Sequence, residues 1–132
     1  MKSIFERLLD LQKNSYCVYS KYPVASIVIA EDGKQYEGVN VENSTYGLTV
    51  CAERNAIGSA VAHGNTKIKE VHLICGKDKK AFGIPCGACC QVISEFMDNG
   101  KIILWNSEGK SQEYSINDFM PMIFNKEFFD KE

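Results

Sequence analysis

The chain has 132 residues, of which 45% are hydrophobic and 24% charged, and its formal net charge is -2. This length suffices for one domain with its own hydrophobic core, so the six cysteines are not needed as disulfide staples. Basic residues are scattered rather than clustered, which argues against a nucleic-acid partner, and no stretch is apolar enough for a membrane span. The charged N-terminus lacks the apolar core of a signal peptide. We therefore expect a single domain over residues 1–132 in a cytoplasmic protein.

The first third of the chain predicts a helix followed by a pair of strands. Apolar residues at helical spacing predict an amphipathic helix over 2–16. The apolar, partly β-branched run 24–30 ends at an Asp-Gly pair, which is a hairpin turn signal, so 34–41 is expected to be the return strand. The polar stretch 42–47 is rich in turn-forming residues and is expected to be a loop.

The remainder of the chain alternates helical and strand patterns. The expected elements are helices over 51–62 and 86–97, strands over 71–75, 101–105 and 112–114, and a closing apolar segment over 118–124. Helices alternating with strands favour the α/β class. We expect a three-layer α/β/α sandwich around a mixed five-stranded sheet, with the hairpin at one side.

Three cysteines stand where the two later helices are expected to begin. Cys51 opens one helical pattern, while Cys86 and Cys89 form a C-x-x-C directly after a proline. Helix N-termini favour negative charge and lower the pKa of a thiol. Three thiolates supply three protein ligands for zinc and leave the fourth position for water, which is typical of a catalytic site. Glu53 is then well placed to handle the protons of that water.

The residues alone leave other uses of the cysteines open. A lone C-x-x-C also occurs in redox pairs and as half of a zinc finger, although a finger needs a second pair. Cys90 could close a structural site as a fourth ligand, but neighbouring residues on a helix point about 100° apart. Cys17 and Cys75 are expected to be small buried hydrophobes. His63 and His72 are expected to be a helix-end residue and a strand residue rather than ligands.

Four blocks of the sequence follow one another in an order that identifies a family. They are 19–24 (YSKYPV), 38–43 (GVNVEN), 51–57 (CAERNAI) and 85–89 (PCGAC). Together they resemble the small, zinc-dependent cytidine deaminases of pyrimidine salvage, over nearly the whole chain. The resemblance implies a homotetramer with one zinc ion per chain. It also implies hydrolytic deamination of cytidine and 2'-deoxycytidine to the corresponding uridines and ammonia.

The same resemblance assigns the chemistry of the centre. Cys51, Cys86 and Cys89 match the zinc ligands of the family. Glu53 matches the residue that takes a proton from water and delivers it to N3 of the base and then to the departing ammonia. One carboxylate can serve in turn as base and acid. Arg54 would return some positive charge to the ligand sulfurs.

Other matching positions concern the substrate. Asn40 and Glu42 match the pair that hydrogen-bonds the sugar hydroxyls, and their i, i+2 spacing places them on one side of an extended strand. Tyr22 stands where the family usually has a phenylalanine against the pyrimidine ring. The backbone N–H of Ala52 matches the group that holds the carbonyl of the base.

Some positions concern neighbouring subunits or depart from the family pattern. The resemblance implies an inter-subunit pocket to which Tyr46 and Phe124 would contribute. Cys90 stands where the family commonly has arginine, which leaves the ligand count unchanged but alters the local charge. Ala25-Ser26 replaces the usual Gly-Ala.

Three other functions are to be weighed against this one. The first is deamination of another aminopyrimidine nucleoside such as blasticidin S, against which the Asn40 and Glu42 pair argues. The second is a polynucleotide-editing deaminase, which the scattered basic residues disfavour. The third is a non-catalytic zinc module used for assembly, which would have no use for Glu53.

Overall fold

The computed structural model describes residues 1–129 of the chain. Its elements, in chain order, are α1 Ile4–Gln12, β1 Val24–Ala30, β2 Gln35–Val39, η1 Tyr46–Leu48, α2 Ala52–Ala62, β3 Ile68–Cys75, α3 Gly87–Phe96, β4 Lys101–Trp105, β5 Ser111–Tyr114, α4 Ile116–Phe119 and η2 Lys126–Phe128. No helix within this range is both long enough and apolar enough to cross a membrane.

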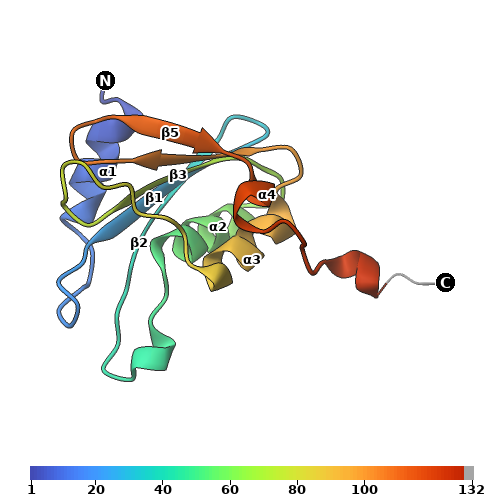
Figure 1. Cartoon of the computed structure of the whole chain (residues 1–132), viewed down its shortest axis with the longest axis horizontal. Coiled ribbons are helices and arrows are strands. Elements are labelled where there is room, and N and C mark those ends of the chain that lie inside the picture. The colour runs from blue at the N-terminus through green and yellow to red at the C-terminus, as the bar shows by residue number, and fades with distance from the viewer. Residues whose placement is uncertain (130–132) are drawn as a thin grey trace.

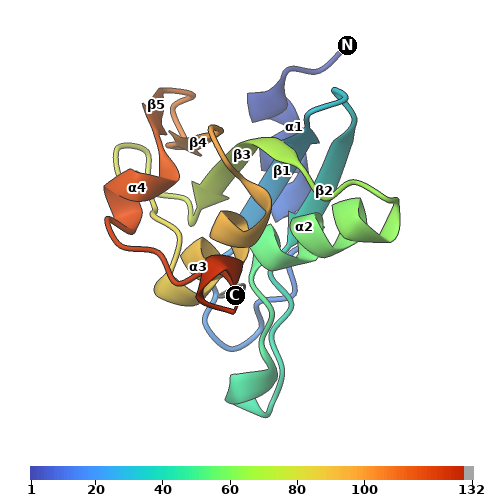
Figure 2. The same cartoon turned by 90° about the vertical axis from the view of Figure 1, so that its right-hand side faces the viewer.

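The strands form one mixed sheet with the order β2-β1-β3-β4-β5. Only β3 and β4 pair in parallel, and α3 makes the crossover between them. The other three pairings are antiparallel. Helix α1 lies against one face of the sheet, while α2 and α3 lie against the other (Figures 1 and 2). The predicted α/β class, the three layers and the mixed five-stranded sheet are confirmed.

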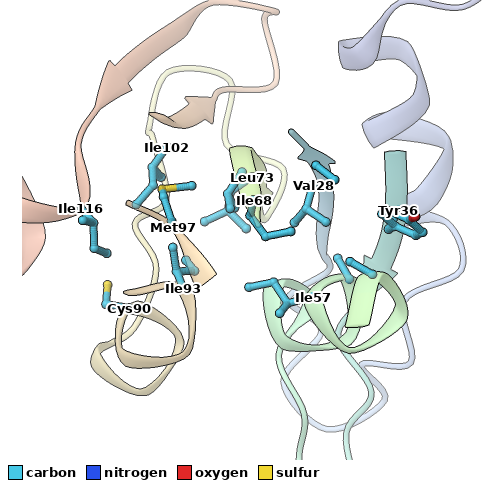
Figure 3. Packing of buried hydrophobic residues seen from close by; sticks show 14 of the residues in the cluster. Val28, Tyr36, Ile57, Ile68, Leu73, Cys90, Ile93, Met97, Ile102 and Ile116 are labelled. Atoms are coloured by element: carbon cyan, nitrogen blue, oxygen red, sulfur yellow. The ribbon is translucent and has the colours of Figure 1, made fainter. Parts of the chain in front are cut away.

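Two hydrophobic clusters hold the layers together, one on each face of the sheet. Strand β1 contributes to both, because successive side chains of a strand point to opposite faces. Ala25 and Ile27 pack under α1, whereas Val28 and Ala30 face α2 and α3. Figure 3 shows the larger cluster, in which side chains of α2 and α3 meet those of β1, β3 and β4. Strand β1 is thus buried on both faces, as its nearly continuous apolar run requires.

Some element boundaries differ from those expected from the sequence. Helix α1 ends at Gln12 rather than near residue 16, because the next residues bond to other strands: Ser15 Oγ donates to the Val24 carbonyl and Tyr16 N to the Asn40 carbonyl. Strand β3 begins three residues earlier than expected, at Ile68, where it pairs with the end of β1.

The closing apolar segment also differs from its expected range, since it starts with the short helix α4. A capping box between Ser115 and Asp118 begins this helix. The tail after α4 then extends away from the body of the molecule (Figure 1).

Candidate metal centre

Three thiols from two helix N-termini meet at one point. The Sγ atoms of Cys51, Cys86 and Cys89 all lie within 4.8 Å of one another, and they form the one cluster with metal-ligand potential among residues 1–129. Cys51 is the N-cap of α2, and Cys86 is the N-cap of α3. Zn–S bonds are about 2.3 Å long, so a single ion can reach all three sulfurs. The all-thiolate donor set suits zinc rather than a hard cation.

The surroundings of Cys86 favour its ionised form. Burial opposes ionisation, but hydrogen bonds with the backbone N–H and the thiol of Cys89 outweigh it and lower the pKa of Cys86. The Cys89 N–H lies 3.4 Å from the Cys86 sulfur in the first turn of α3. Such unpaired amides and the helix dipole stabilise negative charge at a helix N-terminus. Each helix therefore presents its positive end to the ligand sulfurs.

Cys90 lies outside the metal-binding cluster. Its thiol is buried and points toward the Pro85 carbonyl, at 3.6 Å, and into the apolar core (Figure 3). It does not supply a fourth ligand in this arrangement, so a structural zinc site closed by Cys90 is not supported. Cys17 and Cys75 were expected to be small buried hydrophobes. Both are only partly buried, and Cys75 packs against the larger core cluster.

Glu53 is buried beside the cysteine cluster, in the first turn of α2. Only 3% of its surface is exposed. Burial raises the pKa of its carboxyl, although hydrogen bonds from its own backbone and from Cys89 act in the opposite direction. A carboxyl that is costly to ionise can both accept and return a proton, as a general acid and base must. The Glu53 carboxyl is thus placed next to Cys89 of the thiol cluster.

Arg54 stands on the outer side of the same cluster. Its Nη2 lies 3.5 Å from the Cys51 sulfur and 3.4 Å from the Thr49 carbonyl oxygen. The hydrogen bond with Cys51 raises the pKa of the guanidinium, with burial acting in the opposite direction. Its buried Nε has no hydrogen-bond partner among the described residues. The arginine therefore supplies a cation to the thiol cluster, as expected.

A pocket of about 250 Å³ adjoins the metal centre. It is lined by Tyr19, Ser20, Glu42, Tyr46 and Thr49. Thr49 connects this pocket to the thiols, since the same Arg54 nitrogen contacts its carbonyl and Cys51. The sequence pointed to Glu42 and Tyr46 but missed Tyr19, Ser20 and Thr49. Tyr19 and Ser20 lie inside the 19–24 block, and this block is the sequence feature that could have identified them.

The two residues of the expected sugar-binding pair have different surroundings. Glu42 accepts hydrogen bonds from the backbone N–H groups of Tyr19 and Ser20 and from the Ser20 hydroxyl. Asn40 is buried, and its amide holds the chain around Pro23: Nδ2 donates to the Tyr22 carbonyl and Oδ1 accepts from the Val24 N–H. Each end of an amide has capacity for one more hydrogen bond.

Tyr22 and Ala52 flank the metal centre from different elements. Tyr22 precedes β1, is half exposed, and has an interaction between its hydroxyl and the Cys75 thiol. Ala52 is the buried first residue of α2, so its N–H has no partner inside the helix.

Tyr46 and Phe124 are not brought together within the chain. Tyr46 is 74% exposed on η1, with its ring edge-on to Tyr19. Phe124 is 55% exposed on the tail, and its carbonyl accepts from Gln91 of α3. The loop around η1 and the tail project from the body in different directions (Figure 1).

Comparisons with known proteins place this geometry in context. Residues 1–105 match the family model "Cytidine and deoxycytidylate deaminase zinc-binding region". The cytidine deaminase of Sporosarcina psychrophila is 39% identical over 88% of this chain and 85% of its own. The cytidine deaminase of Halalkalibacterium halodurans is 32% identical over 94% of this chain and 93% of its own. The crystal structure of cytidine deaminase from Burkholderia pseudomallei superposes with a TM-score of 0.84 at 32% identity, covering 94% of this chain and all of that one.

Proposed function

Since this chain belongs to the cytidine deaminase family, we propose that its three clustered cysteines hold zinc and that Glu53 moves the protons of the reaction. The protein is a zinc-dependent cytidine deaminase, an enzyme that replaces the amino group of cytidine with a carbonyl oxygen. The observation that carries the site assignment is the buried Glu53 carboxyl beside a cluster of three thiols.

The metal centre and Glu53 have separate roles in the reaction. Cys51, Cys86 and Cys89 would hold zinc, which would supply a Lewis acid that lowers the pKa of water toward neutrality. The Glu53 carboxylate accepts a proton from water as the new C4–O bond forms. It then passes that proton to N3 of the base. Next it takes a second proton from the new C4 hydroxyl as the carbonyl forms, and delivers it to the amino group, which leaves as ammonia when the C4–N bond breaks. Its raised pKa suits both directions of transfer.

The pocket beside the centre is the proposed site of the nucleoside. Glu42 lines this pocket and would accept hydrogen bonds from sugar hydroxyls, while Asn40 fixes the backbone around Pro23 and offers its remaining amide capacity. Tyr22 would pack against the pyrimidine ring. The Ala52 N–H would hold the base carbonyl. We propose both cytidine and 2'-deoxycytidine as substrates, within pyrimidine salvage.

We propose that the protein works as a cytoplasmic homotetramer of single-domain chains. Support comes from the exposed aromatic side chains of Tyr46 on η1 and Phe124 on the tail. A Phe124 from one subunit would thereby reach the pocket rim of another.

The proposal is tested by incubating the purified protein with cytidine, 2'-deoxycytidine and blasticidin S while measuring absorbance, with zinc content determined on the same sample. We expect both cytidines to be converted at about one zinc per chain. Conversion of blasticidin S alone would overturn the substrate assignment. Bound zinc without any conversion would favour a structural zinc module, and a protein without zinc or activity would overturn the cysteine assignment.

A further inference from the structure

One buried side chain ties α1 to the two strand ends beside the metal centre. Gln12 is the last residue of α1 and is only 6% exposed. Its Nε2 donates to the Gly76 carbonyl at 2.7 Å and to the Pro23 carbonyl at 3.1 Å. Both N–H groups of the amide are therefore used. The Gly76 N–H donates in turn to the Pro23 carbonyl at 2.8 Å, so the three residues form a closed set of hydrogen bonds.

The residues directly before Pro23 and Gly76 are Tyr22 and Cys75, and their side chains contact each other. Pro23 directly follows Tyr22, and Gly76 directly follows Cys75 at the end of β3. Gly76 has a positive φ of 68°, and a Cβ at this position would run into the Tyr22 ring, with Cδ1 only 3.1 Å away. The ring therefore lies directly on the glycine. The Tyr22 hydroxyl also interacts with the thiol of Cys75, the residue before Gly76.

We infer that Gln12 is a positioning residue that fixes the ring of Tyr22 for the substrate. Gln12 acts from α1, which lies on the face of the sheet opposite α2 and α3. It holds the Gly76 backbone, on which the Tyr22 ring rests, and the Pro23 backbone, which directly follows Tyr22. This inference rests on the proposed contact between Tyr22 and the pyrimidine. Gln12 itself touches neither the metal ligands nor the pocket lining.

Other hydrogen bonds hold the backbone on either side of Pro23. Asn40 holds the Tyr22 carbonyl and the Val24 N–H, and Ser15 holds the Val24 carbonyl. These contacts fix the chain on either side of Pro23 but do not reach Gly76. Pro23 and Gly76 are already joined by the Gly76 N–H bond to the Pro23 carbonyl, and Gln12 anchors this pair to α1. Its loss would leave the Gly76 carbonyl beneath the ring without its side-chain donor while the other contacts stay.

The test is Gln12→Met, which keeps an unbranched side chain of similar length and removes both donors. We expect the KM for cytidine to rise about tenfold, as the loss of two hydrogen bonds of ordinary strength allows, with kcat within about threefold of the parent value. Zinc content should not change. Hydrogen exchange at the Gly76 amide, measured by mass spectrometry of peptides spanning residues 74–77, should become faster.

Arg7→Ala is the matched control on the same helix. Arg7 binds Gln35 and Glu37 of β2, so its loss weakens the docking of α1 without touching Pro23 or Gly76. We expect this variant to keep the parent KM and the parent exchange rate at Gly76. An equal rise in KM in both variants would overturn the inference, because Gln12 would then only help to dock the helix.

Gln12→Glu provides a second test should Gln12→Met fail to fold. Its carboxylate would face two carbonyl oxygens, so KM should rise at neutral pH and partly recover in acid, where the carboxyl can donate one hydrogen bond. Failure of both variants to fold would overturn a positioning role. An unchanged KM and exchange rate in Gln12→Met, with active parent enzyme, would overturn this inference alone. An inactive parent enzyme would instead overturn the proposed function.

Discussion

Glu53 occupies a place that would be costly for a carboxylate with no chemical task. It is buried next to Cys89, and burial raises its pKa. Desolvating a charge in this way is expensive unless the group is paired or changes its protonation state. A purely structural cluster of thiols would gain nothing from this carboxyl, so its position favours catalysis.

Glu53→Gln should therefore separate catalysis from structure. The amide has nearly the same shape but cannot accept and return a proton as a carboxylate does. We therefore expect turnover of cytidine to fall by about 100-fold to 10,000-fold. Zinc content and the unfolding temperature should not fall. Glu113→Gln is the control, because Glu113 is an exposed carboxylate paired with Lys101. Substantial activity in Glu53→Gln would contradict the assigned role.

His72 is held in one neutral tautomer on β3. The Trp105 indole N–H donates to Nδ1 at 3.0 Å, so that nitrogen carries no proton. Nε2 lies 2.8 Å from a Glu70 carboxylate oxygen and is the protonated nitrogen. Burial lowers the pKa of His72, although Glu70 acts in the opposite direction. As expected from the sequence, this histidine is a strand residue outside the metal centre.

The lowered pKa of His72 predicts a loss of stability in acid. The unfolded chain, with a histidine pKa near 6.5, binds the proton more readily than the folded chain does. The free energy of unfolding should fall as the pH drops through that value toward the folded-state pKa. His72→Gln should show a smaller loss between about pH 8 and about pH 5.5 in urea unfolding. An identical loss in the variant would show that other groups cause it.

At the scale of elements, α2 can approach the sheet closely because Gly38 has no side chain. A Cβ on Gly38 would meet the Ala52 carbonyl oxygen and the Ala56 nitrogen of α2. The facing residues of α2 are small as well, and Ala52, Ala56 and Ala60 are fully buried. This contact sets the distance between β2 and the helix whose first turn carries Glu53.

Two glycine-to-alanine substitutions should consequently have opposite effects. Gly38→Ala would push α2 away from the sheet and should lower the free energy of unfolding by about 1–3 kcal/mol. Gly58→Ala lies within α2, where a Cβ would meet nothing within 4 Å. It should raise the free energy of unfolding by about 0.5–1 kcal/mol through helix propensity. Urea unfolding of both variants measures the difference, and equal effects would contradict this account.

Local sequence patterns predicted the elements and the thiol cluster, but they did not predict contacts between distant segments. The C-A-E and P-C-x-x-C motifs carry their spacing with them, so Cys51, Cys86 and Cys89 could be grouped from the sequence alone. The contact between Gln12 and Gly76 depends instead on how α1 crosses the ends of β1 and β3. The early end of α1 has the same origin, because hydrogen bonds to β1 and to the Asn40 carbonyl override helical spacing.

At the scale of the whole molecule, large apolar side chains remain exposed in two regions. One comprises the 16–22 turn and the 41–48 loop, and the other is the tail. The exposed residues are Tyr16, Val18, Tyr19, Tyr22, Val41, Tyr46 and Leu48 in the first region, and Met122, Phe124, Phe128 and Phe129 in the second. Exposed apolar surface of this kind is typical of protein interfaces.

Sedimentation equilibrium should accordingly give a mass four times that of the chain. Phe124→Ser should shift the equilibrium toward smaller species, because it removes an aromatic ring from the tail. Val61→Ser is the control, since Val61 is an exposed apolar residue at the far end of α2. A stable and active monomer would contradict both the tetramer and the shared pocket.

The separation of the zinc ligands along the chain has a consequence for folding kinetics. Cys51 lies before β3, whereas Cys86 and Cys89 lie after it, so one ion can contact all three sulfurs only once the crossover through α3 has formed. Contacts completed after the folding transition state affect mainly the unfolding rate. Removing zinc with a chelator should therefore speed unfolding in stopped-flow experiments and leave the refolding rate nearly unchanged. Equal changes in both rates would mean that the site forms early. If only the unfolding rate changes, the ion determines how long each molecule stays folded rather than how fast it folds.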